Sequence, residues 1–284
     1  MCELFAMSAR HPTTVGFSLE TLARRGGDIG PHKDGWGVAY FEGKDVFLLR
    51  ESSPAAHSGL VKFMEENGPP SSLVLSHIRH ATQGEIVLRN TQPFKRELGG
   101  RAHVFAHNGD LVGIRDACHL ETRRFRPIGD TDSELAYCCL LERLAPLWDA
   151  VDDTVPSVEA RLEIVANLAA QLKPLGPFNF IYSDGDTLFV HSHRRTQDDG
   201  VVRPPGLYLL ARSCNEQAVD LTQSGVILAP IEQELVLVAS VPLTDEPWEA
   251  MDEGEVVALK SGLVWARSSE AAVAIKGDSD PNSM

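Results

Sequence analysis

Short apolar runs alternate with polar, glycine-containing loops over the first part of the chain. Runs of this length, bounded by Gly, Pro, Asn and Asp, are typical of strands, and a short polar turn between two of them is typical of a hairpin. Glu42-Gly43-Lys44-Asp45 forms one such turn. The pattern predicts short helices at residues 19–25 and 59–67, and strands at residues 4–8, 36–41, 46–50, 73–79 and 102–106.

Two longer segments in the middle of the chain show the apolar spacing of amphipathic helices. The first, residues 133–144, follows Thr131 and Asp132, either of which can cap it, and the second, residues 158–172, follows Ser157. The pattern then predicts strands again, at residues 178–183, 187–192, 207–211, 225–228, 235–240, 255–259 and 263–266. This order of elements favours an α+β fold with antiparallel sheets over a regularly alternating βαβ fold.

The composition is that of a globular protein, with 284 residues of which 43% are hydrophobic and 23% charged. A chain of this length buries roughly 75% of its unfolded surface, so it can form a core without a disulfide or a metal. No stretch rich in Pro, Gly or Ser divides the chain. We expect a single domain over residues 1–268 and a mobile tail at residues 269–284.

The excess of acidic residues bears on which kinds of molecule the protein can bind. Asp and Glu number 40 against 26 Lys and Arg, which gives a formal net charge of −14. A field of this sign repels phosphate backbones and anionic headgroups, so nucleic-acid and membrane binding are disfavoured. Small molecules and proteins are the expected partners.

The five cysteines do not suggest a disulfide framework, because they are scattered and odd in number. Cys138 and Cys139 fall inside a predicted helix, where packing is the simplest role for them. The N-terminus lacks the basic region of a signal peptide, and no run of about 18 apolar residues follows. These features predict a reduced, soluble, cytoplasmic protein.

Cys2 is the first candidate for chemistry, because removal of Met1 would make it the N-terminal residue. A terminal cysteine carries a nucleophilic sulfur and an α-amine on one Cα, and an α-amine with a pKa of about 7.7–8.0 can accept the thiol proton. Taken alone, a cysteine is more often a small buried apolar residue. The catalytic interpretation therefore depends on other parts of a site.

Three polar clusters supply such parts. Residues 76–84 close one predicted strand, residues 106–111 close the next, and residues 129–134 open a helix. Arg79 can hold a carboxylate through two parallel hydrogen bonds. Asn108 and Gly109 offer a side-chain amide and an unobstructed backbone N–H, which are two donors suited to an oxyanion. Asp132 can hold an ammonium group, although it can also be no more than a helix cap.

Together with Cys2, these clusters resemble the glutaminase domain of class II glutamine amidotransferases, within the N-terminal nucleophile hydrolases. The motifs that carry the resemblance are R-x-A-T-x-G from Arg79, H-N-G from His107 and T-D-S-E from Thr131, in that order. Residues 34–37 and 90–94 and the hairpin at 184–185 extend the resemblance over nearly the whole chain, which looks closest to the stand-alone YafJ-like branch. The resemblance implies a four-layer αββα sandwich with two packed antiparallel sheets.

The resemblance also implies a role for each residue. Cys2 would attack the side-chain amide of glutamine with its own amine as base, and Asn108 and the Gly109 N–H would stabilise the oxyanion. Loss of ammonia would leave a γ-glutamyl thioester, which water hydrolyses to glutamate. Arg79 would bind the substrate carboxylate, Asp132 its ammonium group, and Thr82 would shape the substrate loop. No cofactor and no metal are implied.

The sequence departs from the synthase members of the family. His80 and Gln83 stand where an aromatic residue and a histidine are common, and the chain ends where a synthase domain would begin. Either a partner synthase receives the ammonia, or the protein hydrolyses another γ-glutamyl compound, such as a glutathione-like peptide or a γ-glutamyl thiol intermediate. A third hypothesis is a non-catalytic regulatory or scaffold subunit that keeps Met1.

A metal site is a further alternative that the ten histidines raise. His77 and His80 lie three residues apart on a predicted strand, a spacing that points their side chains to opposite faces. No cluster of cysteines or carboxylates accompanies them or the pair His103 and His107. The pattern therefore disfavours zinc.

Overall fold

The structure is a computed structural model that describes residues 2–15, 26, 32–118, 124–214 and 232–268. The helix expected at 19–25, the strand expected at 225–228 and the tail expected at 269–284 lie outside these residues. Within them, no helix is long and apolar enough to cross a membrane.

The first sheet has seven strands, and every neighbouring pair in it is antiparallel. The N-terminal strand β1 lies near its centre, between one strand from the first half of the chain and one from the second. The order across the sheet is β13 (Glu249–Ala250), β11 (Tyr208–Cys214), β12 (Gln233–Ala239), β1 (Glu3–Thr13), β4 (Ser71–Ile78), β2 (Trp36–Glu42) and β3 (Asp45–Glu51).

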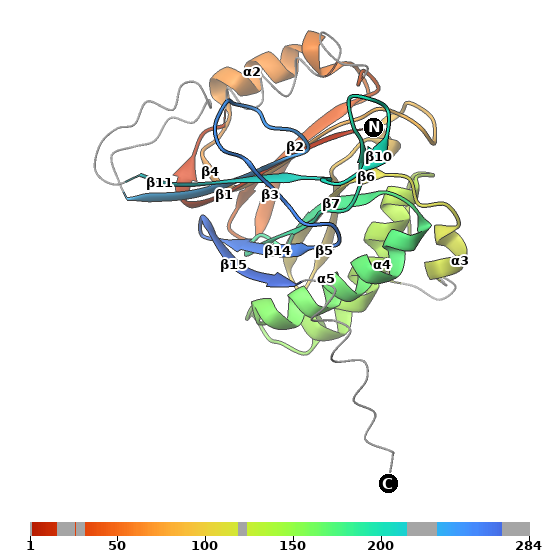
Figure 1. The fold of residues 1–284 in the computed structure, drawn as a ribbon. Coiled ribbons are helices and arrows are strands. Elements are labelled where there is room, and N and C mark those ends of the chain that lie inside the picture. Colours follow the sequence, from red (N-terminus) through yellow and green to blue (C-terminus); the bar gives the residue numbers. More distant parts are fainter. Residues whose placement is uncertain (1, 16–25, 27–31, 119–123, 215–231, 269–284) are drawn as a thin grey trace.

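The second sheet has six antiparallel strands and lies face to face with the first (Figure 1). A separate two-stranded ribbon, β9 (Arg195–Thr196) with β10 (Val202–Arg203), follows its strand β8. The order across the second sheet is β15 (Leu263–Ser268), β14 (Val256–Lys260), β8 (Leu188–His191), β7 (Phe178–Ser183), β6 (Arg101–Gly109) and β5 (Phe94–Leu98).

Each longer helix among the described residues begins at a side-chain cap, and for α4 and α5 the cap is one that the sequence suggests. The cap of α2 (Gly59–Asn67) is Ser58, that of α4 (Asp132–Asp149) is Thr131, and that of α5 (Val158–Leu172) is Ser157. Each hydroxyl accepts a backbone N–H of the first turn, which would otherwise lack a partner. Over the same part of the chain, the shorter helical elements are α3 (Ile114–Cys118) and three 3₁₀ turns, η1 (Ala55–His57), η2 (Leu88–Asn90) and η3 (Lys173–Leu175).

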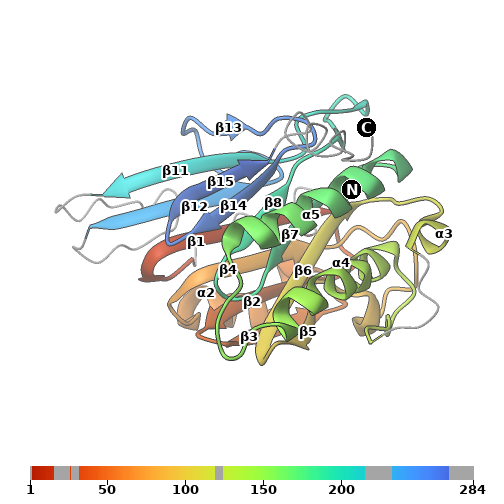
Figure 2. The ribbon, with the colours of Figure 1, turned by 90° about the horizontal axis from the view of Figure 1, so that it is seen from below.

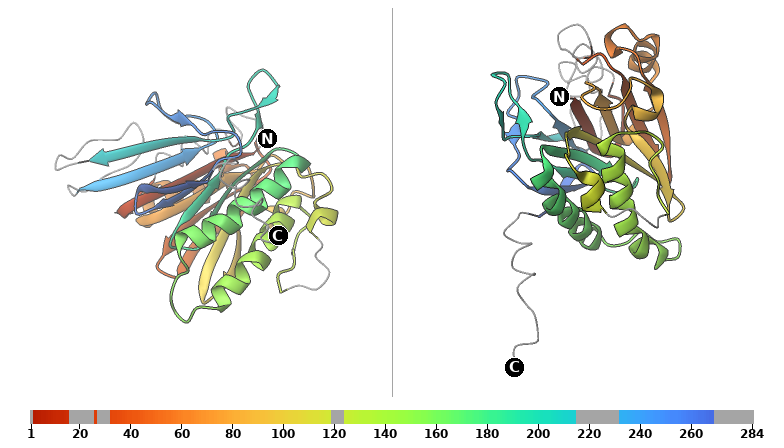
Figure 3. Two further views of the ribbon diagram at one scale, coloured as in Figure 1. Left: turned by 60° about the horizontal axis from the view of Figure 1, so that its bottom comes forward. Right: turned by 90° about the vertical axis from the view of Figure 1, so that its right-hand side faces the viewer.

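Three apolar clusters hold four layers together. Leu4, Ala39, Val104 and Val238 belong to the cluster between the two sheets. The outer face of the first sheet packs on α2, and the outer face of the second packs on α4 and α5, where Trp148 is buried. Figure 1 shows this stack from α2 at the top to α4 and α5 at the bottom, and Figures 2 and 3 show the two long helices lying across the second sheet. The expected α+β fold with an αββα sandwich is confirmed.

The prediction that every cysteine is reduced is wrong for one pair. Cys118 at the end of α3 and Cys139 on α4 form a disulfide, with their Cα atoms 6.3 Å apart. The two helices pack against each other, which brings together positions 21 residues apart in the sequence. Cys2 and Cys138 are not part of a disulfide, and Cys138 is buried on α4, as expected.

Candidate active site

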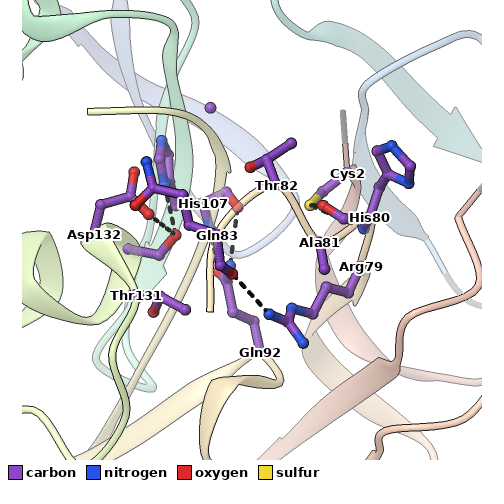
Figure 4. A pocket seen from close by; sticks show the side chains of 12 residues that line it. Cys2, Arg79, His80, Ala81, Thr82, Gln83, Gln92, His107, Thr131 and Asp132 are labelled. Carbon is purple, nitrogen blue, oxygen red and sulfur yellow. Dashed lines mark hydrogen bonds between the residues drawn. The ribbon is translucent and has the colours of Figure 1, made fainter. Parts of the chain in front are cut away.

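Strand and helix ends from both sheets meet at one small pocket. Cys2 directly precedes β1, and Arg79 directly follows β4, the neighbour of β1 in the first sheet. Gly109 ends β6 in the second sheet, and Asp132 begins α4. These four residues and Thr82 line the same cavity of about 30 Å³. Figure 4 shows Cys2 and Arg79 on one side of this pocket and Asp132 on the other.

The Cys2 thiol lies against the backbone of His80. Its sulfur accepts the His80 N–H at 3.3 Å, and it lies 3.5 Å from the His80 carbonyl oxygen, to which the thiol donates. Burial raises the pKa of the Cys2 thiol to about 11, against the smaller opposing effects of the His80 N–H and the Arg79 charge. The sulfur therefore carries its proton at neutral pH, and a nucleophilic Cys2 needs a base beside it.

Asn108 is fully buried, and its side-chain oxygen and nitrogen have no hydrogen-bond partner among the described residues. A buried amide without a partner is costly, so such a group is often found where a ligand supplies the partner. Gly109 comes next in the chain, and a Cβ there would overlap the carbonyl oxygen of Pro177. Only glycine fits at this position. Gly109 lines the pocket with Cys2, whereas Asn108 is not among the lining residues.

The Arg79 guanidinium holds the loop that follows it. It donates to the carbonyl oxygens of Glu85 and Gln83, each at 3.0 Å, and it is almost fully buried. Two carbonyl oxygens therefore accept from guanidinium N–H groups of Arg79 that can also bind a carboxylate. Thr82 lies on the same loop and lines the pocket.

Asp132 orders the turn that follows β6. One carboxylate oxygen accepts the backbone N–H of Leu111 at 2.8 Å, and the other faces the Ser133 hydroxyl at 3.4 Å. The N-cap of α4 is Thr131 and not Asp132, so the cap interpretation of Asp132 is wrong. The carboxylate is buried at the first residue of the helix, where the helix dipole favours a negative charge.

Several residues around the pocket were not predicted to belong to it. Gln83 lines the pocket, and its amide donates to Asp110. The His107 ring contacts the Ser133 hydroxyl at 2.9 Å, and the Gln92 side chain bonds both the N–H and the carbonyl of His107. Gln83, His107 and Gln92 all lie in segments that carry the family resemblance, but nothing in the spacing indicates which of their groups meet.

Asn179 also lies outside the predicted set. It pairs with Asn108 across β6 and β7, and its amide donates to the Asn108 carbonyl at 3.1 Å. No motif marks it in the sequence. Among the described residues, no group of three His, Cys, Asp or Glu side chains is placed to hold a metal ion. His80 instead faces Asp34, with 3.6 Å between Nδ1 and the carboxylate.

Comparison with known proteins identifies relatives of the same length and relatives that are much longer. The chain is 38% identical over 258 residues to YafJ of Escherichia coli strain K12, a predicted glutamine amidotransferase, covering 90% of this chain and 96% of YafJ. A crystal structure of a predicted glutamine amidotransferase from Pseudomonas aeruginosa is 32% identical, with a TM-score of 0.63, and the match covers 93% of this chain and 100% of that one.

The Bacillus subtilis glutamine phosphoribosylpyrophosphate amidotransferase shares the fold at 15% identity, with a TM-score of 0.57. That match covers 94% of this chain but 49% of the enzyme. The family model for class II glutamine amidotransferases matches residues 1–282. This chain belongs to the class II glutamine amidotransferase family.

Proposed function

We propose that this protein hydrolyses the side-chain amide of glutamine, with Cys2 as the nucleophile once Met1 has been removed. The observation that carries the proposal is the unpartnered, buried amide of Asn108. Asn108 directly precedes Gly109 in the chain, and Gly109 lines one pocket with Cys2. Two preorganised donors beside a nucleophile are what a tetrahedral oxyanion requires.

In the first half of the reaction the α-amine of Cys2 takes the thiol proton as the sulfur attacks the amide carbon. A C–S bond forms, and the amide oxygen becomes an oxyanion that accepts hydrogen bonds from Asn108 Nδ2 and the Gly109 N–H. The C–N bond then breaks, and the ammonium group returns the proton to the leaving nitrogen, which departs as ammonia. The raised pKa of Cys2 supports a base that acts during the attack, since little thiolate exists beforehand.

In the second half, water attacks the γ-glutamyl thioester and the same amine takes its proton. The C–S bond breaks, glutamate leaves, and the sulfur recovers a proton. The same two donors serve the second oxyanion, so one site supports both steps.

Arg79 and Asp132 are the proposed anchors for the substrate carboxylate and ammonium groups. The pocket, at about 30 Å³, is too small for glutamine, and Gln83, which lines it, is held by Asp110. The loop from Thr82 to Glu85 therefore has to move on binding. Arg79 would then exchange loop carbonyls for the substrate carboxylate, which keeps its donors paired throughout.

The fate of the ammonia depends on a partner. This chain matches only part of the longer relatives that are named amidophosphoribosyltransferases. The match covers 48% of the one from Methanocaldococcus jannaschii. We propose that a separate synthase of the cytoplasm receives the ammonia. Hydrolysis of another γ-glutamyl compound is the competing proposal, because both anchors contact only the glutamyl end.

Turnover of glutamine, measured against that of γ-glutamyl peptides, tests the two substrates. The glutaminase proposal predicts that glutamine has the highest kcat/KM and that Cys2→Ser abolishes turnover. Cys138→Ala, which removes a buried thiol outside the pocket, should not abolish it. A γ-glutamyl peptide turned over faster than glutamine would favour the competing proposal. A folded protein of intact mass that retains Met1 and turns over neither would indicate the scaffold role.

A further inference from the structure

The disulfide between Cys118 and Cys139 joins two segments that each carry part of the candidate active site. Cys118 ends α3, which follows the turn after Gly109, and Cys139 lies on α4, whose first residue is Asp132 (Figure 1). The hydrogen bond from the Leu111 N–H to the Asp132 carboxylate, at 2.8 Å, joins the same two segments. The disulfide therefore reinforces a link that also belongs to the site.

The helix α3 depends on its contacts with the rest of the fold. It has five residues, and a helix of this length is not stable in isolation. Its buried residues are Ile114 and Cys118, and both belong to the apolar cluster around α4 and α5. The Ile114 N–H donates to the Leu111 carbonyl at 3.4 Å, so the helix continues the turn before it. Loss of the covalent bond at Cys118 therefore acts on a weakly held helix and on that turn.

The start of α4 is fixed by contacts that do not involve the disulfide. Thr131 caps the helix, and the Asp130 N–H just before it donates to the Asn90 side chain at 2.9 Å. The turn after Gly109 has a bond of its own as well, from the Val112 N–H to the Leu175 carbonyl at 3.2 Å. Breaking the disulfide should therefore leave Asp132 in place, free α3, and loosen the turn without unfolding it.

The two sulfurs differ in how well a small molecule can reach them. Cys118, at the end of its helix, is 8% exposed, and Cys139, in the middle of α4, is 3% exposed. A small thiol or disulfide that enters when α3 opens therefore meets Cys118 first. Thiol–disulfide exchange makes and breaks such a bond through a mixed disulfide.

We propose that Cys118 and Cys139 form a reversible thiol–disulfide site that regulates the turn after Gly109, with a low-molecular-weight disulfide as the oxidant. Cys118, once deprotonated, attacks one sulfur of that disulfide and releases the first small thiol. Cys139, once deprotonated, attacks the Cys118 sulfur of the mixed disulfide and releases the second. The protein loses two electrons and two protons, and the small disulfide gains them as two thiols.

The effect of this site on catalysis rests on the proposed function. When the disulfide is formed, the turn holds the Gly109 N–H where it can donate to the oxyanion, a contact made only in the transition state. When the disulfide is reduced, the looser turn should lower kcat. Arg79 and Asp132, the proposed substrate anchors, keep their positions, so KM should change little.

Alkylation of the denatured, acid-quenched protein after equilibration in buffers of 2-mercaptoethanol and its disulfide tests the site itself. The Cys2→Ser protein is used, so that the result does not depend on the proposed reaction. Peptide mapping should find the Cys118–Cys139 bridge at the oxidising end and two alkylated thiols at the reducing end. A pair that stays bridged, or stays reduced, in every buffer would overturn the proposed site.

Amide hydrogen exchange measures the loosening of α3. Reduction should speed exchange in residues 111–118 by about fivefold or more and leave that of α5 unchanged. Cys118→Ala and Cys139→Ala should each show the fast exchange in both kinds of buffer. Cys138→Ala is the matched control, because it removes the neighbouring buried thiol that is not in the disulfide, and it should respond like the parent protein. Exchange in residues 111–118 that ignores reduction would overturn the connection to the turn.

Steady-state kinetics with glutamine are the last readout. Reduction should lower kcat of the wild-type protein by about threefold or more relative to Cys118→Ala in the same buffers, with KM changed less than twofold. Oxidation of Cys2 itself affects both proteins alike, so this comparison isolates the disulfide. Equal kcat in the two redox states would overturn the regulatory effect. Absence of turnover in both states, with the exchange response intact, would instead contradict the proposed function.

Discussion

The Asp132 carboxylate, at the start of α4, accepts the backbone N–H of Leu111 at 2.8 Å. Leu111 is the second residue after Gly109, so a side chain proposed to bind the substrate ammonium also fixes the turn that carries an oxyanion donor. The two roles can be separated, because a neutral amide keeps the acceptor oxygen and loses the charge.

We predict that Asp132→Asn raises KM for glutamine at least tenfold with a smaller effect on kcat. Asp132→Ala loses the acceptor as well, so it should also lower kcat by disturbing the turn before Leu111. Steady-state kinetics of both variants measure this split. Equal kcat in the two variants would show that the Leu111 bond does not position the site.

A substitution of Asn108 tests the role of its amide, because we expect it to lower activity without lowering stability. Its amide has no partner among the described residues, so Asn108→Leu, of similar volume, should not lower the melting temperature. Loss of one oxyanion donor should lower kcat by about 10²–10³-fold. A variant that unfolds at lower temperature, or that keeps its kcat, would contradict the role proposed for this amide.

Arg79→Lys tests the loop that follows β4. Lysine keeps the charge but cannot bond two carbonyl oxygens, or one carboxylate in bidentate fashion, with a planar fork. We expect KM for glutamine to rise by about tenfold or more, and the loop from Thr82 to Glu85 to become more sensitive to protease. Lys95→Arg, at an exposed ion pair with Asp45, is a control that should change neither.

The sequence predicted local elements well, because their signals are local. The capped helices α2, α4 and α5 and the hairpin of β2 and β3 appear where the pattern places them. The position of β1 between β4 and β12 could not be predicted in this way, since it depends on pairing between residues as distant as Phe5 and Ala239. The family resemblance supplied the layer order that periodicity could not.

In the candidate site, too, residues with a local sequence signal could be predicted, and residues brought in by distant pairing could not. Cys2 could be selected from its position after Met1, and Arg79, Gly109 and Asp132 because each lies in a short motif. All four line one pocket. Asn179 carries no motif, and its contact with Asn108 exists only because β6 and β7 pair in one register. The disulfide between α3 and α4 was missed for a similar reason, since helix packing and not spacing brings its cysteines together.

Buried histidines predict the pH dependence of stability. Burial lowers the pKa of His191 to about 3, and the repulsion from His193 adds to this effect, whereas an unfolded histidine has a pKa of about 6.5. Between these values only the unfolded state binds the proton, so stability falls as the pH falls below about 6.5. His77 and His103, with pKa values lowered mainly by burial to about 3 and about 4, act in the same direction.

Chemical denaturation at pH 7, 6 and 5 measures this effect. Between pH 6 and 5, replacing His191 with leucine should reduce the loss of unfolding free energy by about 1 kcal/mol per pH unit. An unchanged slope in a folded His191→Leu variant would show that His191 is protonated in the native state.

The proposed function requires that Cys2, freed of Met1, is the nucleophile in a γ-glutamyl site. Labelling by a glutamine analogue that carries an electrophilic ketone in place of the amide, followed by intact mass and peptide mapping, tests it most directly. We expect a protein without Met1 that gains one adduct, on Cys2, with protection by glutamine and no adduct in Cys2→Ser. A folded, Met1-free protein in which Cys2 stays unlabelled would contradict it.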